Sequence, residues 1–225
     1  MPLKGAIFDM DGTMIDSMHL WVNIWREYPE ARGLQPSEED LTNMRGMMLR
    51  DMAAYMIQTY GLTETPDNII DDINRHVEQG YATNVSVKPG TIDFLEQLKA
   101  AGIPMVVASA TERYLVVDTL KRLGLYEYFD AIFTARVDGS KYEAGIFLKA
   151  VDAVQAAGAA RGMDIEKDDI WVFEDTYASI RGAKKADLHV LAVYDQWADH
   201  NHDKIVDLAD VYCPEGFLNL DYTKL

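Results

Sequence analysis

The chain has 225 residues, 48% of them hydrophobic and 26% charged, a composition that suits one large α/β domain or a core with a smaller insertion. Its formal net charge of −16 disfavours nucleic acids and anionic membranes as partners, so an anionic substrate would need local cations or a metal ion. No apolar run of 18 residues and no signal-peptide pattern occurs, so we expect no membrane span and a cytoplasmic location.

The first predicted element is a buried strand at Gly5–Phe8, a short apolar run that ends at the turn Asp9-Met10-Asp11-Gly12-Thr13. Side chains alternate along a strand, so the carboxylates of Asp9 and Asp11 are expected on the same side. Two adjacent carboxylates repel each other, and a hard divalent cation removes that repulsion. Gly12 allows a turn whose backbone N–H groups face an anion. The alternative is an Asp-rich turn with solvated side chains.

Residues 17–86 show helical patterns and no clear strand. Asp16 or Ser17 is expected to cap a helix that runs to about Arg32. A capping box at Ser37-Glu38-Glu39-Asp40 predicts a second helix, and further helices are expected at 48–60 and from Thr65-Pro66 to about 81. The block is therefore predicted to be a helical insertion in the domain that the opening strand begins.

From Val87 onward, predicted strands alternate with predicted helices. Strands are expected at 103–108, 131–134, 170–173 and 189–193, and helices at 92–101, 112–123 (capped by Thr111), 143–160 and 176–186. The single cysteine, Cys213, lies in a last short strand and is interpreted as structural. This alternation predicts a doubly wound, Rossmann-like parallel sheet with helices on both faces. The predicted core comprises residues 1–16 and 87–225, and the helical domain comprises 17–86.

Polar residues follow three more of these strands, at Ser109-Ala110-Thr111, Ser140-Lys141 and Glu174-Asp175-Thr176. Parallel strands end at one edge of a sheet, so these groups should join Asp9 and Asp11 there. Taken singly, Ser109 can cap a helix, Lys141 can be a solvated loop lysine and Glu174-Asp175 can open a helix. Their ordered occurrence at strand ends predicts a site for phosphate and a metal ion. The acid pairs contain no His or Cys, which favours Mg²⁺ over Zn²⁺.

With these four motifs in order, the chain resembles phosphatases of the haloacid dehalogenase superfamily that carry a helical cap of the first type, within the β-phosphoglucomutase-like subgroup. The resemblance implies that Asp9 is the nucleophile and that Asp11 is the general acid and base. It also implies a set of ligands. Mg²⁺ would be held by Asp9, Asp11 (through its carbonyl), Glu174 and Asp175, and the phosphoryl group would be bound by Thr13, Ser109, Ala110 and Lys141. Members of the family often have Pro-x-Pro after this lysine, whereas here Tyr142-Glu143-Ala144 follows, which makes Lys149 the fallback.

The helical domain is expected to be the cap that sets substrate specificity, with hinges near 15–17 and 86–87. Arg45 and Arg50 flank Gly46 in a stretch that resembles the cap loop of β-phosphoglucomutase-like members, where such groups grip a sugar phosphate. Two exposed surface arginines are the alternative interpretation. The roles of His19 and Trp197 stay open.

The expected function is that of a Mg²⁺-dependent phosphatase acting on a small phosphorylated metabolite, with a sugar phosphate as the favoured class. A sugar phosphomutase is the alternative. It would need the cap to exclude water and the site to hold two phosphates; Thr111, Glu112 and Arg113 are candidates for the second phosphate, although Glu112 has the wrong charge. A non-catalytic sugar-phosphate sensor is a third hypothesis. Asp11 argues against a dehalogenase, and the absence of Lys between Lys4 and Lys88 argues against a phosphonoacetaldehyde hydrolase. No nucleic-acid or membrane partner is expected, and the protein should be a monomer or weak homodimer.

Overall fold

The computed structural model describes residues 3–44 and 47–225, which form two compact units. One unit contains the chain up to Asp16 together with Ser86–Leu225, and the other contains Ser17–Val85. Ser86, which the sequence analysis assigned to the helical domain, belongs to the first unit. In the described part of the chain, no helix combines the length and the apolar character needed to cross a membrane.

The first unit is built on a six-stranded parallel sheet in the order β5-β4-β1-β6-β7-β8. The strands are β1 (Gly5–Phe8), β4 (Met105–Ser109), β5 (Ala131–Thr134), β6 (Ile170–Glu174), β7 (His189–Val193) and β8 (Val211–Cys213). The helices are α6 (Thr91–Ala100), α7 (Arg113–Arg122), α8 (Ala135–Asp138), α9 (Gly145–Ala160), α10 (Tyr177–Lys185) and α11 (His202–Leu208). Helices separate the successive strands because parallel strands need crossover connections. The predicted α/β class is confirmed.

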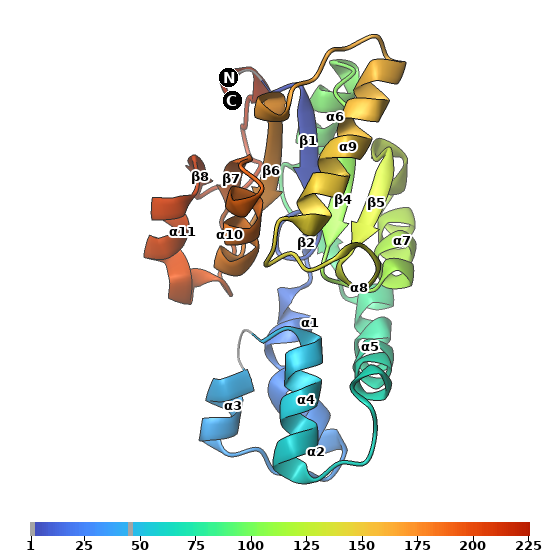
Figure 1. Ribbon diagram of the computed structural model, residues 1–225, viewed down its shortest axis with the longest axis vertical. Helices are drawn as coiled ribbons and strands as arrows, with labels where there is room; N and C mark the ends of the chain where they lie inside the picture. The colour runs from blue at the N-terminus through green and yellow to red at the C-terminus, as the bar shows by residue number, and fades with distance from the viewer. Residues whose placement is uncertain (1–2, 45–46) are drawn as a thin grey trace. The chain divides into compact units, whose positions relative to one another are not determined.

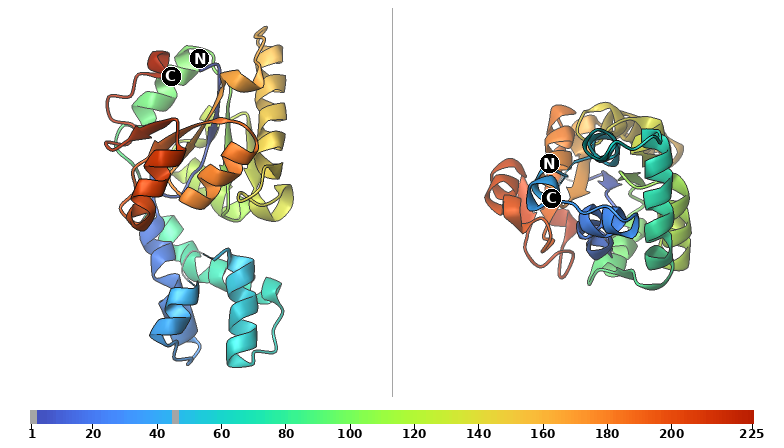
Figure 2. Two further views of the ribbon diagram at one scale, coloured as in Figure 1. Left: turned by 60° about the vertical axis from the view of Figure 1, so that its left-hand side comes forward. Right: turned by 90° about the horizontal axis from the view of Figure 1, so that it is seen from below.

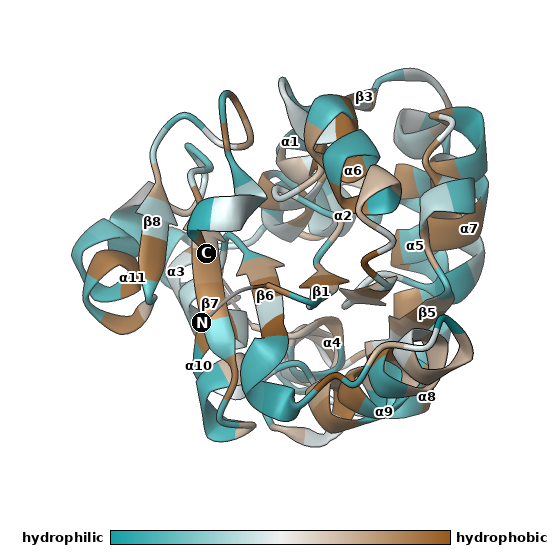
Figure 3. Cartoon of the chain, turned by 90° about the horizontal axis from the view of Figure 1, so that it is seen from above, coloured by the Kyte–Doolittle hydropathy of each residue, from teal (hydrophilic) through white to brown (hydrophobic). Residues whose placement is uncertain are grey.

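The two faces of this sheet are covered by different helices, with α6 on one side and α9 and α10 on the other (Figures 1 and 3). Toward α9 and α10, Ile7 of β1 and Val172 of β6 are fully buried in an apolar cluster that includes residues of both helices. Toward α6, Phe8 stacks on Phe173 with ring centroids 4.5 Å apart. Because side chains alternate along a strand, the residues two positions beyond Ile7 and Val172 continue the face of α9 and α10.

The second unit consists of helices, and its described residues contain no strand (Figure 2). They are α1 (Met18–Val22), α2 (Ile24–Ala31), α3 (Glu38–Met44), α4 (Leu49–Tyr60) and α5 (Pro66–Thr83). The single helix predicted up to Arg32 is wrong, because it is divided at Asn23, a residue type that is unfavourable inside helices. The capping box is present, since the Ser37 hydroxyl accepts from the Asp40 N–H at 3.1 Å and the Asp40 carboxylate accepts from the Ser37 N–H at 2.9 Å.

The two segments of the first unit that border the helical insertion pair with each other. β2 (Ile15–Asp16) and β3 (Ser86–Val87) form an antiparallel ribbon in which Ile15 lies opposite Val87. The next residue, Lys88, donates its N–H to the Met14 carbonyl at 2.9 Å. This pairing places Lys88 beside the turn that follows β1.

Candidate active site

The register of the sheet brings the ends of β1 and β6 together. Phe8 lies opposite Phe173, and the Asp9 N–H donates to the Phe173 carbonyl at 2.9 Å. Asp9 and Glu174 are therefore neighbours on adjacent strands, and both side chains point to the face that α9 and α10 cover. Asp9 is 5% exposed and Glu174 is 1% exposed, so two carboxylates are buried side by side. A buried pair of like charges needs a cation.

Lys141 supplies that cation from the loop before α9. Its side chain is 2% exposed, and its ammonium lies 2.5 Å from Asp9 Oδ1 and also contacts Glu174 Oε1. The two carboxylates raise the pKa of Lys141 well above its ordinary value, although burial acts in the opposite direction. The fallback, Lys149, has a half-exposed side chain that lies 3.3 Å from Asp138. Lys141, and not Lys149, reaches the acid pair.

The Lys141 loop is held without the prolines that are common in the family. The Tyr142 N–H donates to the Ser140 hydroxyl at 3.1 Å, and Lys185 of α10 donates to the Tyr142 carbonyl at 3.1 Å. Gly182 of α10 packs against the Lys141 backbone so closely that a Cβ there would lie 1.9 Å from the Lys141 carbonyl oxygen. Packing against α10 thus performs the fixing role that prolines would have.

Asp9, Glu174 and Asp175 form a cluster that is suited to a metal ion. Each offers a carboxylate oxygen, and these oxygens lie within 4.8 Å of one another. Burial, followed by the neighbouring carboxylates Glu174 and Asp9, raises the pKa of Asp175, and burial is the main reason that the pKa of Asp9 rises from 3.8 to about 7. Thr13 donates to Asp175 Oδ1 at 3.3 Å, whereas Asp175 Oδ2 is buried and has no hydrogen-bond partner among the residues that the structure describes. An all-oxygen set with such an orphaned atom fits Mg²⁺.

Asp11 lies apart from this cluster and faces the end of β4. The Thr111 hydroxyl donates to Asp11 Oδ2 at 2.7 Å, and the Ser109 hydroxyl lies 3.5 Å from the same oxygen. The prediction that Thr111 caps α7 is wrong, because Glu112 occupies the N-cap position and the Thr111 hydroxyl is directed at Asp11. The neighbouring Ala110, predicted to offer its amide to phosphate, is exposed at the same edge.

Sequence reasoning missed a second cation beside the acid cluster. The Lys88 ammonium donates to the carbonyls of Gly12 and Tyr194, at 2.5 and 2.8 Å, and to the Asp195 carboxylate at 3.1 Å. Lys88 also lowers the pKa of Asp175, against the larger opposing effects. The available signal was its place directly before Pro89-Gly90, at the predicted hinge.

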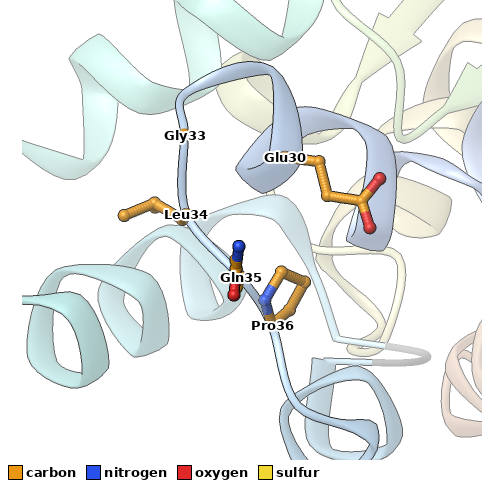
Figure 4. A pocket seen from close by; sticks show the side chains of 5 residues that line it. All are labelled: Glu30, Gly33, Leu34, Gln35 and Pro36. Atoms are coloured by element: carbon orange, nitrogen blue, oxygen red, sulfur yellow. The ribbon is translucent and has the colours of Figure 1, made fainter.

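The predicted cap residues have different outcomes. Arg45 lies outside the described residues, and the Arg50 guanidinium lies 2.6 Å from the Asp67 carboxylate on the surface of the helical unit. A hollow of about 400 Å³ in this unit is lined by Glu30, Gly33, Leu34, Gln35 and Pro36 (Figure 4). No cationic side chain is among these lining residues, so the hollow lacks the groups that a phosphorylated ligand requires.

Comparisons with known proteins agree with this geometry. Residues 6–193 match the family described as haloacid dehalogenase-like hydrolase. A phosphorylated carbohydrates phosphatase of Thermotoga maritima is 24% identical over 186 residues, covering 82% of each chain. A phosphoglycolate phosphatase of Agrobacterium fabrum is 32% identical over 162 residues, covering 67% of this chain and 68% of the relative. A Thermotoga maritima structure solved as a candidate β-phosphoglucomutase has a TM-score of 0.71 at 22% identity and covers 96% of this chain and 97% of its own. The chain therefore belongs to the haloacid dehalogenase-like hydrolase family.

Proposed function

We propose that the chain is a Mg²⁺-dependent phosphatase that hydrolyses a small phosphorylated metabolite, with a sugar phosphate as the favoured class. The observation that carries this proposal is the buried Lys141 ammonium between Asp9 and Glu174, beside the unpartnered oxygen of Asp175. Such a site combines a nucleophilic carboxylate, a cation for phosphoryl oxygens and metal ligands. The Thermotoga maritima phosphatase acts on phosphorylated carbohydrates, which supports the substrate class.

In the proposed mechanism, Asp9 attacks phosphorus, and the bond from phosphorus to the leaving oxygen breaks as the aspartyl-phosphate forms. Asp11 gives its proton to that leaving oxygen. In the second step, Asp11 takes a proton from the water that attacks phosphorus, and Asp9 is released as a carboxylate. Ser109, the Ala110 amide and Lys141 bind the non-bridging oxygens of the phosphoryl group as it is transferred, and Thr13 supports the loop beside them.

The proposed metal ligands are Asp9, Glu174, Asp175 and the Asp11 carbonyl. When bound, Mg²⁺ would neutralise negative charge on the phosphoryl oxygens and on the acid cluster itself. The Ser17–Val85 unit would act as the cap, moving about the β2–β3 ribbon and contacting the part of the substrate that is not transferred.

A phosphomutase has less support, because the residues that could hold a second phosphate are already engaged. The Arg113 guanidinium donates to the Ile132 carbonyl at 2.6 Å, and Glu112 pairs with Arg136 at 3.1 Å. Thr111 is bonded to Asp11.

The proposal is tested by incubating chelator-treated protein with p-nitrophenyl phosphate and with a panel of phosphorylated metabolites, with and without Mg²⁺. Release of inorganic phosphate only when Mg²⁺ is present is the expected result. Conversion of one sugar phosphate into an isomer, without phosphate release, would identify a phosphomutase. Tight binding of a sugar phosphate without turnover would identify a sensor, and full activity after rigorous chelation would contradict the metal requirement.

A further inference from the structure

Thr111 has a buried side chain, and its hydroxyl does not cap the helix that follows it. A threonine directly before a helix ordinarily accepts a hydrogen bond from the N–H groups of the first turn. In this chain the α7 N-cap is Glu112, whose side chain makes no capping hydrogen bond within the described residues. Thr111 is 5% exposed and donates its hydroxyl proton to Asp11 Oδ2 at 2.7 Å, a contact between residues 100 positions apart.

The same hydroxyl stands in a small cluster with Ser109. The Thr111 N–H donates to the Ser109 hydroxyl at 3.0 Å, and that hydroxyl lies 3.5 Å from Asp11 Oδ2. The Thr111 backbone is therefore fixed at the end of β4, and its side chain reaches from there to the carboxylate. A hydroxyl held by a fixed backbone constrains its partner more strongly than a long, flexible side chain does.

We propose that Thr111 is the positioning residue for the general acid and base: its hydroxyl binds Asp11 Oδ2 and so orients the carboxyl group, whose Oδ1 exchanges a proton with substrate. The inference rests on the proposed function of Asp11. A hydroxyl donor serves both steps, because Oδ2 accepts the hydrogen bond whether Oδ1 carries the proton or has given it away. In the first step the Oδ1 proton passes to the leaving oxygen as its bond to phosphorus breaks. In the second step Oδ1 takes a proton from the attacking water.

The leaving group of the substrate provides a readout that a merely structural role would not change. Para-nitrophenolate leaves without a proton, whereas the alkoxide of benzyl phosphate needs one. The ratio kcat/KM covers the steps up to departure of the leaving group, so it reports on Asp11 as an acid and not on the later water attack. General acid catalysis contributes roughly 10²- to 10⁴-fold, and an acid that is present but poorly placed loses part of that factor.

The experiment compares Thr111→Val, which keeps the shape, and Thr111→Ser, which keeps the hydroxyl, on benzyl phosphate and p-nitrophenyl phosphate. For Thr111→Val we expect kcat/KM to fall by about ten- to 100-fold with benzyl phosphate and by less than about threefold with p-nitrophenyl phosphate. Thr111→Ser should restore most of the loss. Thr134→Val is the matched control. Thr134 lies opposite Ser109 in the sheet, and its buried hydroxyl has no hydrogen-bond partner among the described residues, so both substrates should be unaffected.

Equal losses with both substrates, no loss with either, or a Thr111→Ser variant as impaired as Thr111→Val would each overturn the inference. If Thr111→Val does not fold, as judged by its melting temperature, Thr111→Ala takes its place with the same expectations. Failure of the proposed function is distinguishable from failure of this inference. If the proposed function is wrong, the wild-type protein will release no phosphate from either substrate, or Asp11→Asn will show no greater loss with benzyl phosphate than with p-nitrophenyl phosphate.

Discussion

Gly182 offers a test of how strictly the Lys141 loop must be placed. A Cβ at this position would lie 1.9 Å from the Lys141 carbonyl oxygen, and real Cβ atoms essentially never approach within 3.0 Å of such an atom, so Gly182→Ala requires a shift of at least 1.1 Å (3.0 minus 1.9). The helix backbone of α10 is fixed by its own hydrogen bonds, so the loop that carries Lys141 should move instead. A displacement of about 1 Å at a catalytic group costs roughly 10²-fold in rate.

The effect of Gly182→Ala on stability should be smaller than its effect on catalysis. Overpacking costs about 1–3 kcal/mol, and replacing glycine by alanine within a helix returns about 1 kcal/mol. We therefore expect kcat/KM for p-nitrophenyl phosphate to fall by about 100-fold while unfolding remains cooperative and the free energy of unfolding falls by at most about 2 kcal/mol.

Gly145→Ala is the matched control for this substitution. Gly145 begins α9 in the same unit, and no atom of the described residues lies within 4 Å of the Cβ it would gain, so activity and stability should be preserved. Wild-type kcat/KM in Gly182→Ala would refute the claim that this contact sets the position of Lys141. An equal loss in Gly145→Ala would show that the assay reports on helix flexibility instead.

Three further predictions follow from the site and the helical unit. Asp9→Asn should abolish phosphate release while keeping the melting temperature near or above that of wild type, because an amide cannot form the acyl phosphate; near-normal turnover would remove Asp9 from the mechanism. Burial raises the pKa of Asp9 from 3.8 to about 7, so its contribution to the stability of the metal-free protein is complete below about pH 4 and is lost as the pH rises through about 7. Adding Mg²⁺ should therefore raise the melting temperature more at about pH 8 than at about pH 5. Equal increases at the two pH values would contradict a raised pKa of Asp9. If Arg50 grips substrate, Arg50→Ala should lower kcat/KM for a sugar phosphate by about ten- to 150-fold and leave p-nitrophenyl phosphate unchanged. Asp67→Ala, which removes only the partner of Arg50, is the control, and equal effects of the two substitutions would indicate an ordinary surface ion pair.

The sheet and the position of its functional edge were predictable because they depend on short-range patterns. Apolar runs of four to six residues, each followed by Asp, Ser or Glu, indicated where β1, β4 and β6 end, and parallel strands necessarily end together. Gly61, which directly follows the helix predicted at 48–60, ends α4 in a left-handed conformation, a role for which glycine is favoured. These features require no knowledge of partners that are distant in the sequence.

Two residues whose roles sequence reasoning did not find, Thr111 and Gly182, have partners far away along the chain. Thr111 was expected to cap the helix next to it, but a carboxylate 100 positions earlier binds its hydroxyl. The sequence analysis did not single out Gly182, which is important because it packs against the backbone of Lys141. Asn23 divided a helix whose apolar spacing appeared continuous, because periodicity records the buried face and not the local preference of one residue.

The contact between Lys88 and the Gly12 carbonyl has an electronic consequence for the turn after β1. A carbonyl oxygen that accepts a hydrogen bond from an ammonium draws electron density away from the peptide nitrogen that follows it. The nitrogen of that peptide group belongs to Thr13, in the turn whose N–H groups are expected to face an anion. The Thr13 N–H is thereby made a stronger donor, so the positive charge of Lys88 acts on this turn through one peptide bond.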